Sequence, residues 1–168
     1  IISNQSSYQN IKTVYIGGGT PSSLPMPLLE KLLMTIHECV KIENVLEFSI
    51  ETNPNDINQE LVDLFVKYGI TRVSLGVQTF NQKHLDFLGR THTKEDVDQA
   101  IKILADSGIL NINVDMIFSL VNQTLEELEE TTAFNKKSLK EINHIPNKII
   151  SEIFKMNKSL YDDKVISG

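Results

Sequence analysis

The residues best suited to chemistry in this sequence follow, or interrupt, four short apolar runs. They are the glycine-rich turn Gly17-Gly18-Gly19-Thr20-Pro21, the acid Glu51, the amide Gln78 and the acid Asp115. A turn without side chains lets a ligand approach the backbone closely, and carboxylates and amides bind amino and hydroxyl groups. Because a carboxylate within an apolar run needs a partner, Asp115 is the most informative of these residues. Together they indicate a site for a small polar ligand.

Each of these residues also has a purely structural interpretation. The glycines suit a tight turn alone, Glu51 suits an exposed strand end, and Gln78 suits a loop whose backbone it satisfies. The turn is neither a phosphate-binding P-loop nor a G-x-G-x-x-G dinucleotide motif, since Pro21 follows Thr20 where those motifs need other residues. The chemistry therefore depends on whether the four positions converge.

Other reactive residue types offer weaker signals. The histidines at positions 37, 84, 92 and 144 lack metal-ligand spacing, and no Ser-His-Asp set is visible. We expect His37 on a helix, His84 at the surface rather than as a ligand, and Thr91-His92-Thr93 at the start of a helix. Cys39 is the single cysteine, and its place in a helical stretch predicts a packed thiol.

The elements that must position these residues alternate between strand and helix. Strands are predicted at Thr13–Ile16, Leu46–Ile50, Arg72–Val77 and Asn111–Ile117, and helices at Pro27–Val40, Asp56–Gly69, Thr93–Gly108 and from Thr124 onward. Thr93 with Asp96, and Thr124 with Glu127, suit capping boxes. This order predicts parallel strands covered by helices, either a doubly wound sheet or a (β/α) barrel, complete or partial. In both folds, ligands bind at the carboxyl ends of the strands.

Bulk composition narrows the class of protein. The net charge of −6 and the lack of a basic tract disfavour a nucleic-acid partner, and no apolar run is long enough for a transmembrane segment. With one cysteine, an internal disulfide is excluded. A cytoplasmic location is the default expectation, and the start at Ile1 suggests a piece of a longer protein.

Several segments, in order, resemble a known family. "VYIGGGTPSSL", "SIETNP", "GITRVSLGVQTFNQKHLDFLGRTHT" and "NINVDMIFSLVNQT", within residues 11–130, are similar to the radical S-adenosylmethionine (SAM) proteins of the coproporphyrinogen oxidase type. "ETNP", "GVQTF" and "LGRTHT" resemble the heme-chaperone branch, HemW, more than the oxidase branch. The alternatives are an oxygen-independent coproporphyrinogen III oxidase, which removes propionate carboxyls, and an inactive truncated remnant.

The resemblance implies a fold and a set of ligands. The implied fold is α/β, a partial (β/α) TIM-like barrel of which this chain has four to five βα units. Residues 1–134 would form part of the core, and residues 135–168 a divergent tail. The implied cofactors are SAM and a [4Fe-4S] cluster, with heme or porphyrin as cargo and a heme-acceptor protein as partner. The implied SAM-contacting residues are Gly18, Gly19, Thr20, Glu51, Gln78, Arg90 and Asp115. Arg90, otherwise a surface arginine beside Gly89, would face the SAM carboxylate.

Two departures from the family pattern bear on this prediction. The CxxxCxxC motif that ligates the cluster is absent, so this chain alone is expected to hold no cluster and to catalyse nothing. Ser119-Leu120-Val121 replaces the Gly-Leu-Pro that precedes "QT" in the family, which predicts a different turn after the fourth strand.

Overall fold

The computed structural model describes residues 10–117, 120, 122–124, 126 and 127, and structural statements below concern these residues. They form a four-stranded parallel sheet in the order β1-β2-β3-β4. The strands are β1 (Thr13–Ile16), β2 (Glu47–Thr52), β3 (Arg72–Gln78) and β4 (Asn111–Met116). The helices are α1 (Met26–Cys39), α2 (Gln59–Lys67), α3 (Gln82–Phe87) and α4 (Lys94–Asp106).

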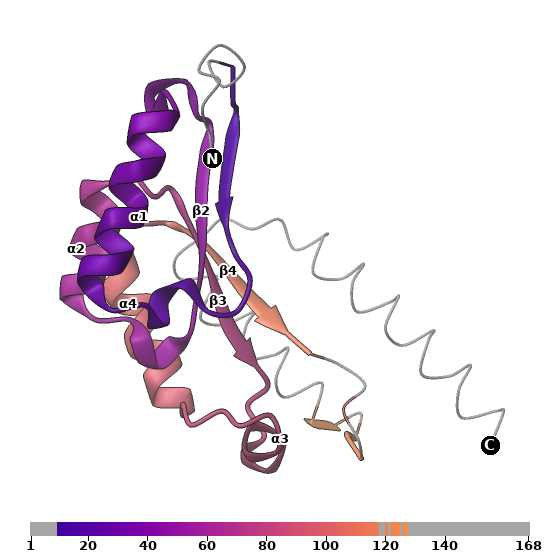
Figure 1. The fold of residues 1–168 in the computed structure, drawn as a ribbon. Coiled ribbons are helices and arrows are strands. Elements are labelled where there is room, and N and C mark those ends of the chain that lie inside the picture. Colours follow the sequence, from indigo (N-terminus) through magenta and orange to yellow (C-terminus); the bar gives the residue numbers. More distant parts are fainter. Residues whose placement is uncertain (1–9, 118–119, 121, 125, 128–168) are drawn as a thin grey trace, which may run out of the picture.

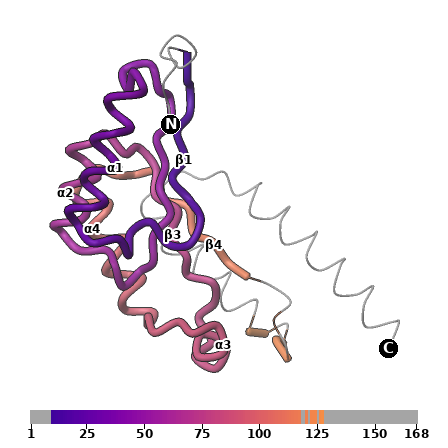
Figure 2. Tube along the Cα trace, in the orientation of Figure 1, coloured from indigo at the N-terminus to yellow at the C-terminus, as the bar shows by residue number. Residues whose placement is uncertain are grey.

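The order of the strands decides between the two architectures that the sequence leaves open. A doubly wound sheet reverses direction part-way, so its helices lie on both faces. Here each strand pairs with the next one along the chain, and α1, α2 and α4 all cover one face of the sheet (Figures 1 and 2). This is the arrangement of a (β/α) barrel. The prediction of an α/β fold of partial TIM-barrel type is confirmed.

The side chains of each strand alternate between the two faces of the sheet. In β3, Val73, Leu75 and Val77 are fully buried and point toward the helices, because successive side chains of a strand point to opposite faces. They join a single core to which α1 contributes Leu29 and Leu33. The opposite face of the sheet carries polar residues, which is where the candidate site lies.

The predicted elements agree closely with the observed ones, with two informative differences. β2 extends to Thr52, so Glu51 lies within the strand rather than after it. Helix α3 was not predicted. It spans only six residues and is capped by Asn81, whose Oδ1 accepts hydrogen bonds from the backbone amides of Lys83 and His84 at 3.0 and 3.4 Å. Figure 1 shows α3 beyond the carboxyl end of β3.

The predicted helix boundaries are explained by local contacts. Thr93 and Asp96 form a capping box at the start of α4, as predicted. Gly69 and Gly108 follow α2 and α4 with φ of 70° and 87°, the left-handed conformation that glycine adopts readily at helix ends. None of the helices among the described residues is long and apolar enough to cross a membrane.

Some predictions fall outside the described residues. They are the helix body after Glu127, the turn at Ser119 and Val121, and the division into a core of residues 1–134 and a tail of residues 135–168. These stay predictions.

Candidate functional site

The glycine-rich turn after β1 is bonded to the end of β2. The amide of Gly18 donates a hydrogen bond to Glu51 Oε2 at 2.9 Å. Gly18 and Gly19 have φ of 86° and 65°, values that side chains disfavour. Gly17 is needed for a different reason: a Cβ there would overlap the ring of Tyr15. The turn therefore requires glycine for both its backbone shape and the space beside it.

Tyr15 lies beside Glu51 and fixes its second carboxylate oxygen. The Tyr15 hydroxyl donates a short hydrogen bond to Glu51 Oε1. This bond, together with burial and the negative charge of Glu51, raises the pKa of Tyr15 to about 12. The phenol is therefore protonated at neutral pH and acts as a donor, so Glu51 is oriented from both sides.

A second polar group joins the turn to the segment after α3. The guanidinium of Arg90 donates a short hydrogen bond to Asn53 Oδ1. Asn53 Nδ2 lies 3.5 Å from Thr20 Oγ1, and the backbone N–H of Asn53 donates a hydrogen bond to Ser22 Oγ at 3.3 Å. Arg90, which comes from the loop between α3 and α4, is thus held beside the glycine turn.

Asp115 has the partners that its position within a strand demands. Ser74 Oγ donates to Asp115 Oδ2 at 2.6 Å, and Asn113 Nδ2 donates to Asp115 Oδ1 at 2.6 Å and lies 3.0 Å from Ser74 Oγ. The three side chains come from adjacent strands, β3 and β4, and share the face away from the helices. Each oxygen of the Asp115 carboxylate therefore has a hydrogen-bond donor within the sheet.

Gln78 ends β3 in an unusual backbone conformation. Its φ is 67°, and the pairing of β3 with β4 is irregular between Gly76 and Gln78. A Cβ at Gly76 would lie only 2.9 Å from Gln78 Nε2, so the glycine makes room for the amide. The Gln78 side chain lies with Asp115 in the lining of one cavity.

These groups surround one cavity of about 140 Å³ at the carboxyl ends of the strands. Its lining includes the predicted residues Gly19, Thr20, Glu51, Gln78, Arg90 and Asp115, together with Thr52, Asn53, Ser74 and Gly76. Gly18 does not line the cavity but supports Glu51. The convergence of the strand ends is therefore present in the structure, while the ligand roles of these residues stay a prediction.

Sequence reasoning missed Ser74 and Gly76 and left Asn53 outside the chosen set. The sequence did hold a signal for Ser74 and Gly76. Because successive strand side chains point to opposite faces, these two positions of "RVSLGVQ" lie on the same face as Gln78. For Asn53 the sequence placed it at the right strand end, yet its bond to Arg90 joins positions 37 residues apart. No local pattern reveals such a pairing.

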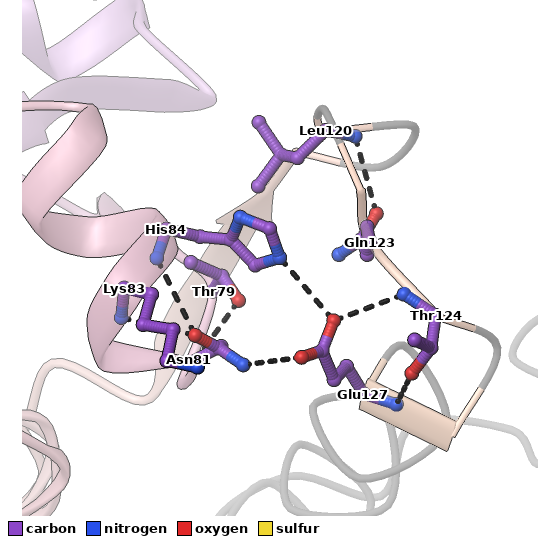
Figure 3. Close-up of polar contacts among 8 residues, drawn as sticks. All are labelled: Thr79, Asn81, Lys83, His84, Leu120, Gln123, Thr124 and Glu127. Atoms are coloured by element: carbon purple, nitrogen blue, oxygen red, sulfur yellow. Dashed lines mark hydrogen bonds and ion pairs between the residues drawn. The ribbon is translucent and has the colours of Figure 1, made fainter.

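A separate polar cluster joins α3 to the segment after β4 (Figure 3). Glu127 Oε2 lies 3.2 Å from His84 Nε2 and accepts from the Thr124 amide at 2.9 Å, while Asn81 Nδ2 donates to Glu127 Oε1 at 2.6 Å. The Thr124 amide bond, followed by the contact with His84, lowers the pKa of Glu127. The Thr124–Glu127 capping box is confirmed by the reciprocal bond from the Glu127 amide to Thr124 Oγ1 at 3.2 Å.

The expectation that His84 lies at the surface is wrong. Its exposed fraction is 8%, because α3 packs this face inward and Glu127 covers the ring. His37 is on helix α1 as expected, and Thr93, which follows His92, is the N-cap of α4. Cys39 is the last residue of α1 and only half-buried, so it is less enclosed than a packed thiol.

The residues present do not suit an iron–sulfur cluster. The sequence has one cysteine, Cys39, whereas protein-bound clusters need several thiolates. Cys39 also stands at the far end of the 14-residue α1, about 20 Å along the helix from the strand ends. No group of three or more potential metal ligands occurs within the described part of the chain.

Fold and site together define an α/β protein of the partial TIM-barrel type, with a polar cavity at the carboxyl ends of its strands. Residues 4–134 match the model of the radical SAM superfamily. The chain belongs to that superfamily, and the family resemblance predicted from the sequence is confirmed.

The curated relatives of this chain are named as heme chaperones and as a coproporphyrinogen oxidase. The chain is 42% identical over 118 residues to the heme chaperone HemW of Lactococcus lactis and 39% identical over 123 residues to that of Bacillus subtilis. These alignments cover 70% and 73% of this chain but 31% and 32% of the relatives. The chain therefore spans about a third of the length of these proteins. An oxygen-independent coproporphyrinogen III oxidase of Paracoccus denitrificans is 27% identical over 121 residues, which are 72% of this chain and 27% of that protein.

Solved structures support the fold. The coproporphyrinogen III oxidase HemN of Escherichia coli, described as a radical SAM enzyme, superimposes with a TM-score of 0.68 and 21% identity. That match covers 90% of this chain and 40% of HemN. The archaeal Elp3 of Methanocaldococcus infernus gives a TM-score of 0.61 at 22% identity, over 74% of this chain and 33% of Elp3. At these identities the likeness concerns the fold.

Proposed function

We propose that this chain forms the SAM-binding part of a HemW-like heme chaperone of the radical SAM superfamily. The observation that carries the proposal is the convergence of Glu51, Gln78, Arg90 and Asp115 on one cavity above the glycine turn. These residues come from three strands and one loop, so neither a turn nor a single strand end explains their grouping. When bound next to a reduced cluster, SAM supplies radical chemistry.

The cavity suits the amino-acid end of SAM. It offers carboxylates for an ammonium group and the guanidinium of Arg90 for a carboxylate. Its volume of about 140 Å³ is below the ~300–1,000 Å³ of pockets that enclose whole ligands. The methionyl end of SAM would therefore enter the cavity, and the rest of the ligand would lie across the open strand ends. The backbone of Gly19 and Thr20 would lie along the bound SAM.

The proposal does not place a [4Fe-4S] cluster on the residues of this chain. Cys39 is neither near the cavity nor accompanied by further cysteines. The proposal therefore assigns SAM binding, and not cluster ligation, to these residues. A cytoplasmic location and a heme-acceptor partner stay predictions.

Heme as cargo is supported by the curated relatives, since those that are 42% and 39% identical carry the name heme chaperone. The coproporphyrinogen oxidase relative is 27% identical, which makes the oxidase the second candidate. The two differ in chemistry: an oxidase releases CO₂ from porphyrinogen propionates, and a chaperone transfers intact heme.

A SAM titration tests the binding proposal. We expect the native chain to bind SAM and Asp115→Ala to bind it about tenfold more weakly, because Ser74 and Asn113 lose their shared partner and the ligand loses a charge. Thr35→Ala, an exposed change on α1, serves as the control and should leave the affinity unchanged. Equal affinity of Asp115→Ala and native chain would remove Asp115 from the site, and absence of binding to the native chain would refute the proposal.

A second experiment separates chaperone from oxidase. The full-length protein would be reconstituted with iron and sulfide without oxygen, and then supplied with SAM and either heme or coproporphyrinogen III. Transfer of intact heme to an acceptor with no release of CO₂ supports the proposal. Release of CO₂ from the propionates would establish the oxidase. If neither heme transfer nor CO₂ release occurred, the protein would be an inactive remnant.

A further inference from the structure

The turn that ends β3 has a strained backbone. The Thr79 amide donates to the carbonyl of Val77, two residues earlier, at 2.8 Å. With the φ of 67° at the central residue Gln78, this bond defines a γ-turn of the positive-φ form, which is rare and strained. Glycine would adopt this φ at little cost, yet the sequence has a glutamine. Such strain persists only where surrounding contacts enforce it.

The surrounding contacts identify what enforces the turn. The carbonyl of Val77 accepts a second hydrogen bond, from His92 Nε2 at 2.9 Å. The carbonyl of Gln78 accepts from the Ile117 amide at 2.9 Å, which ties the turn to the end of β4. Thr79 is fully buried. Of these contacts, the one from His92 comes from a side chain.

His92 is suited to this role by its environment. Its exposed fraction is 2%, and burial lowers its pKa, so the ring is neutral at pH 7. Because a carbonyl only accepts hydrogen bonds, Nε2 must carry the ring's hydrogen. His92 also comes two residues after Arg90. Its bond to Val77 therefore joins the segment that supplies Arg90 to the turn that supplies Gln78.

We propose that His92 is a positioning residue of the SAM site, which it serves through Gln78. By holding the carbonyl of Val77, it keeps the γ-turn closed and the Gln78 side chain directed into the cavity. Without this bond, the γ-turn is no longer held closed and the Gln78 amide loses its fixed position in the cavity. The inference rests on the proposed function, because it assigns a part in SAM binding to a residue that does not line the cavity.

Two substitutions of similar size separate the hydrogen bond from packing. In His92→Gln, the side-chain amide retains an N–H donor at nearly the position of Nε2, whereas His92→Leu fills the space without a donor. We expect His92→Leu to weaken SAM binding about tenfold and His92→Gln by less than about threefold. In a Gln78→Ala background, His92→Leu should cause less than about a twofold further loss, because the residue it acts through is gone.

Hydrogen exchange at the Thr79 amide gives a readout that needs no ligand. In His92→Leu this amide should exchange at least about tenfold faster than in the native chain, with exchange in α2 unchanged. In His92→Gln it should remain protected. The inference would be overturned if His92→Leu bound SAM as tightly as the native chain does. It would also be overturned if His92→Leu weakened SAM binding as much in the Gln78→Ala background as in the native chain, or if it left the exchange of the Thr79 amide unchanged. Failure of the native chain to bind SAM is seen before any variant is made and refutes the proposed function instead.

Discussion

The amide of Gly18 donates a hydrogen bond to Oε2 of Glu51 at 2.9 Å. This bond joins the turn after β1 to the last part of β2, across 33 positions of the chain. The other oxygen of Glu51 accepts from Tyr15. Glu51 therefore has two tasks: its oxygens hold the glycine turn, and its charge faces the cavity.

These two tasks are separable by substitution. Glu51→Gln keeps an oxygen that accepts from Gly18 but removes the charge, whereas Glu51→Ala removes both. We expect both variants to bind SAM about tenfold more weakly, because an ammonium group loses its counter-charge. Only Glu51→Ala should also lower the urea midpoint of unfolding, since the Gly18 amide loses its partner. Isothermal titration and urea denaturation measure the two effects.

Glu43→Ala is the matched control, because this acid is exposed and precedes β2 at the opposite edge of the sheet. It should bind SAM like the native chain. If Glu51→Gln also bound SAM with native affinity, the charge of Glu51 would have no part in ligand binding.

Gly18 is predicted to be required for its backbone conformation rather than for space. Its φ is 86°, and no atom lies within 4 Å of the position a Cβ would take. Gly18→Ala should therefore destabilise the fold by about 1–2 kcal/mol through backbone strain alone. Gly18→Asn should cost less, since asparagine tolerates positive φ. Urea denaturation measures both, and equal costs for the two variants would contradict a conformational origin.

The strand ends could be predicted because they depend on local pattern. Apolar runs, turn residues and the βα order placed Glu51, Gln78 and Asp115 at one edge of a parallel sheet, as the lining of the cavity bears out. The choice between a doubly wound sheet and a barrel could not be made. It depends on which strands pair and which face the helices cover, and neither is encoded in the spacing of apolar residues.

The features that local sequence patterns could not reveal depend on contacts between distant segments. Arg90 was expected only from the family resemblance, because its partner Asn53 lies 37 positions earlier. His84 was misjudged because α3, with six residues, is too short to show a helical period. Its burial depends on Glu127, which lies 43 positions later.

The contact between Glu127 and His84 is predicted to hold the segment after β4 against α3. Glu127→Ala removes the bonds to His84, Asn81 and the Thr124 amide together, so its urea midpoint at pH 7 should fall below that of the native chain. Because the pKa of Glu127 is lowered from 4.5, its contribution to stability is present above that pH. It is lost as the pH falls through the lower native pKa.

The difference between Glu127→Ala and the native chain should therefore shrink in acid. Urea denaturation from pH 7 down to about pH 3 measures it. Glu126→Ala, at the neighbouring exposed acid, is the control and should match the native chain throughout. A difference that stays constant down to that pH would show that the charge of Glu127 contributes nothing.

His92 should make the stability of the fold depend on pH near neutrality. Burial lowers its pKa below the usual histidine value of 6.5, so just below pH 6.5 the unfolded chain binds a proton more readily than the folded chain. The stabilisation is complete above pH 6.5 and decreases as the pH falls toward the native pKa. His92→Gln and His92→Leu both remove the titrating ring, although only the first keeps a donor for Val77. Both should therefore flatten the change in the urea midpoint between pH 7.5 and pH 5, roughly the range in which histidine titrates. A slope as steep as that of the native chain in both variants would mean that the folded state does not favour a neutral ring at position 92.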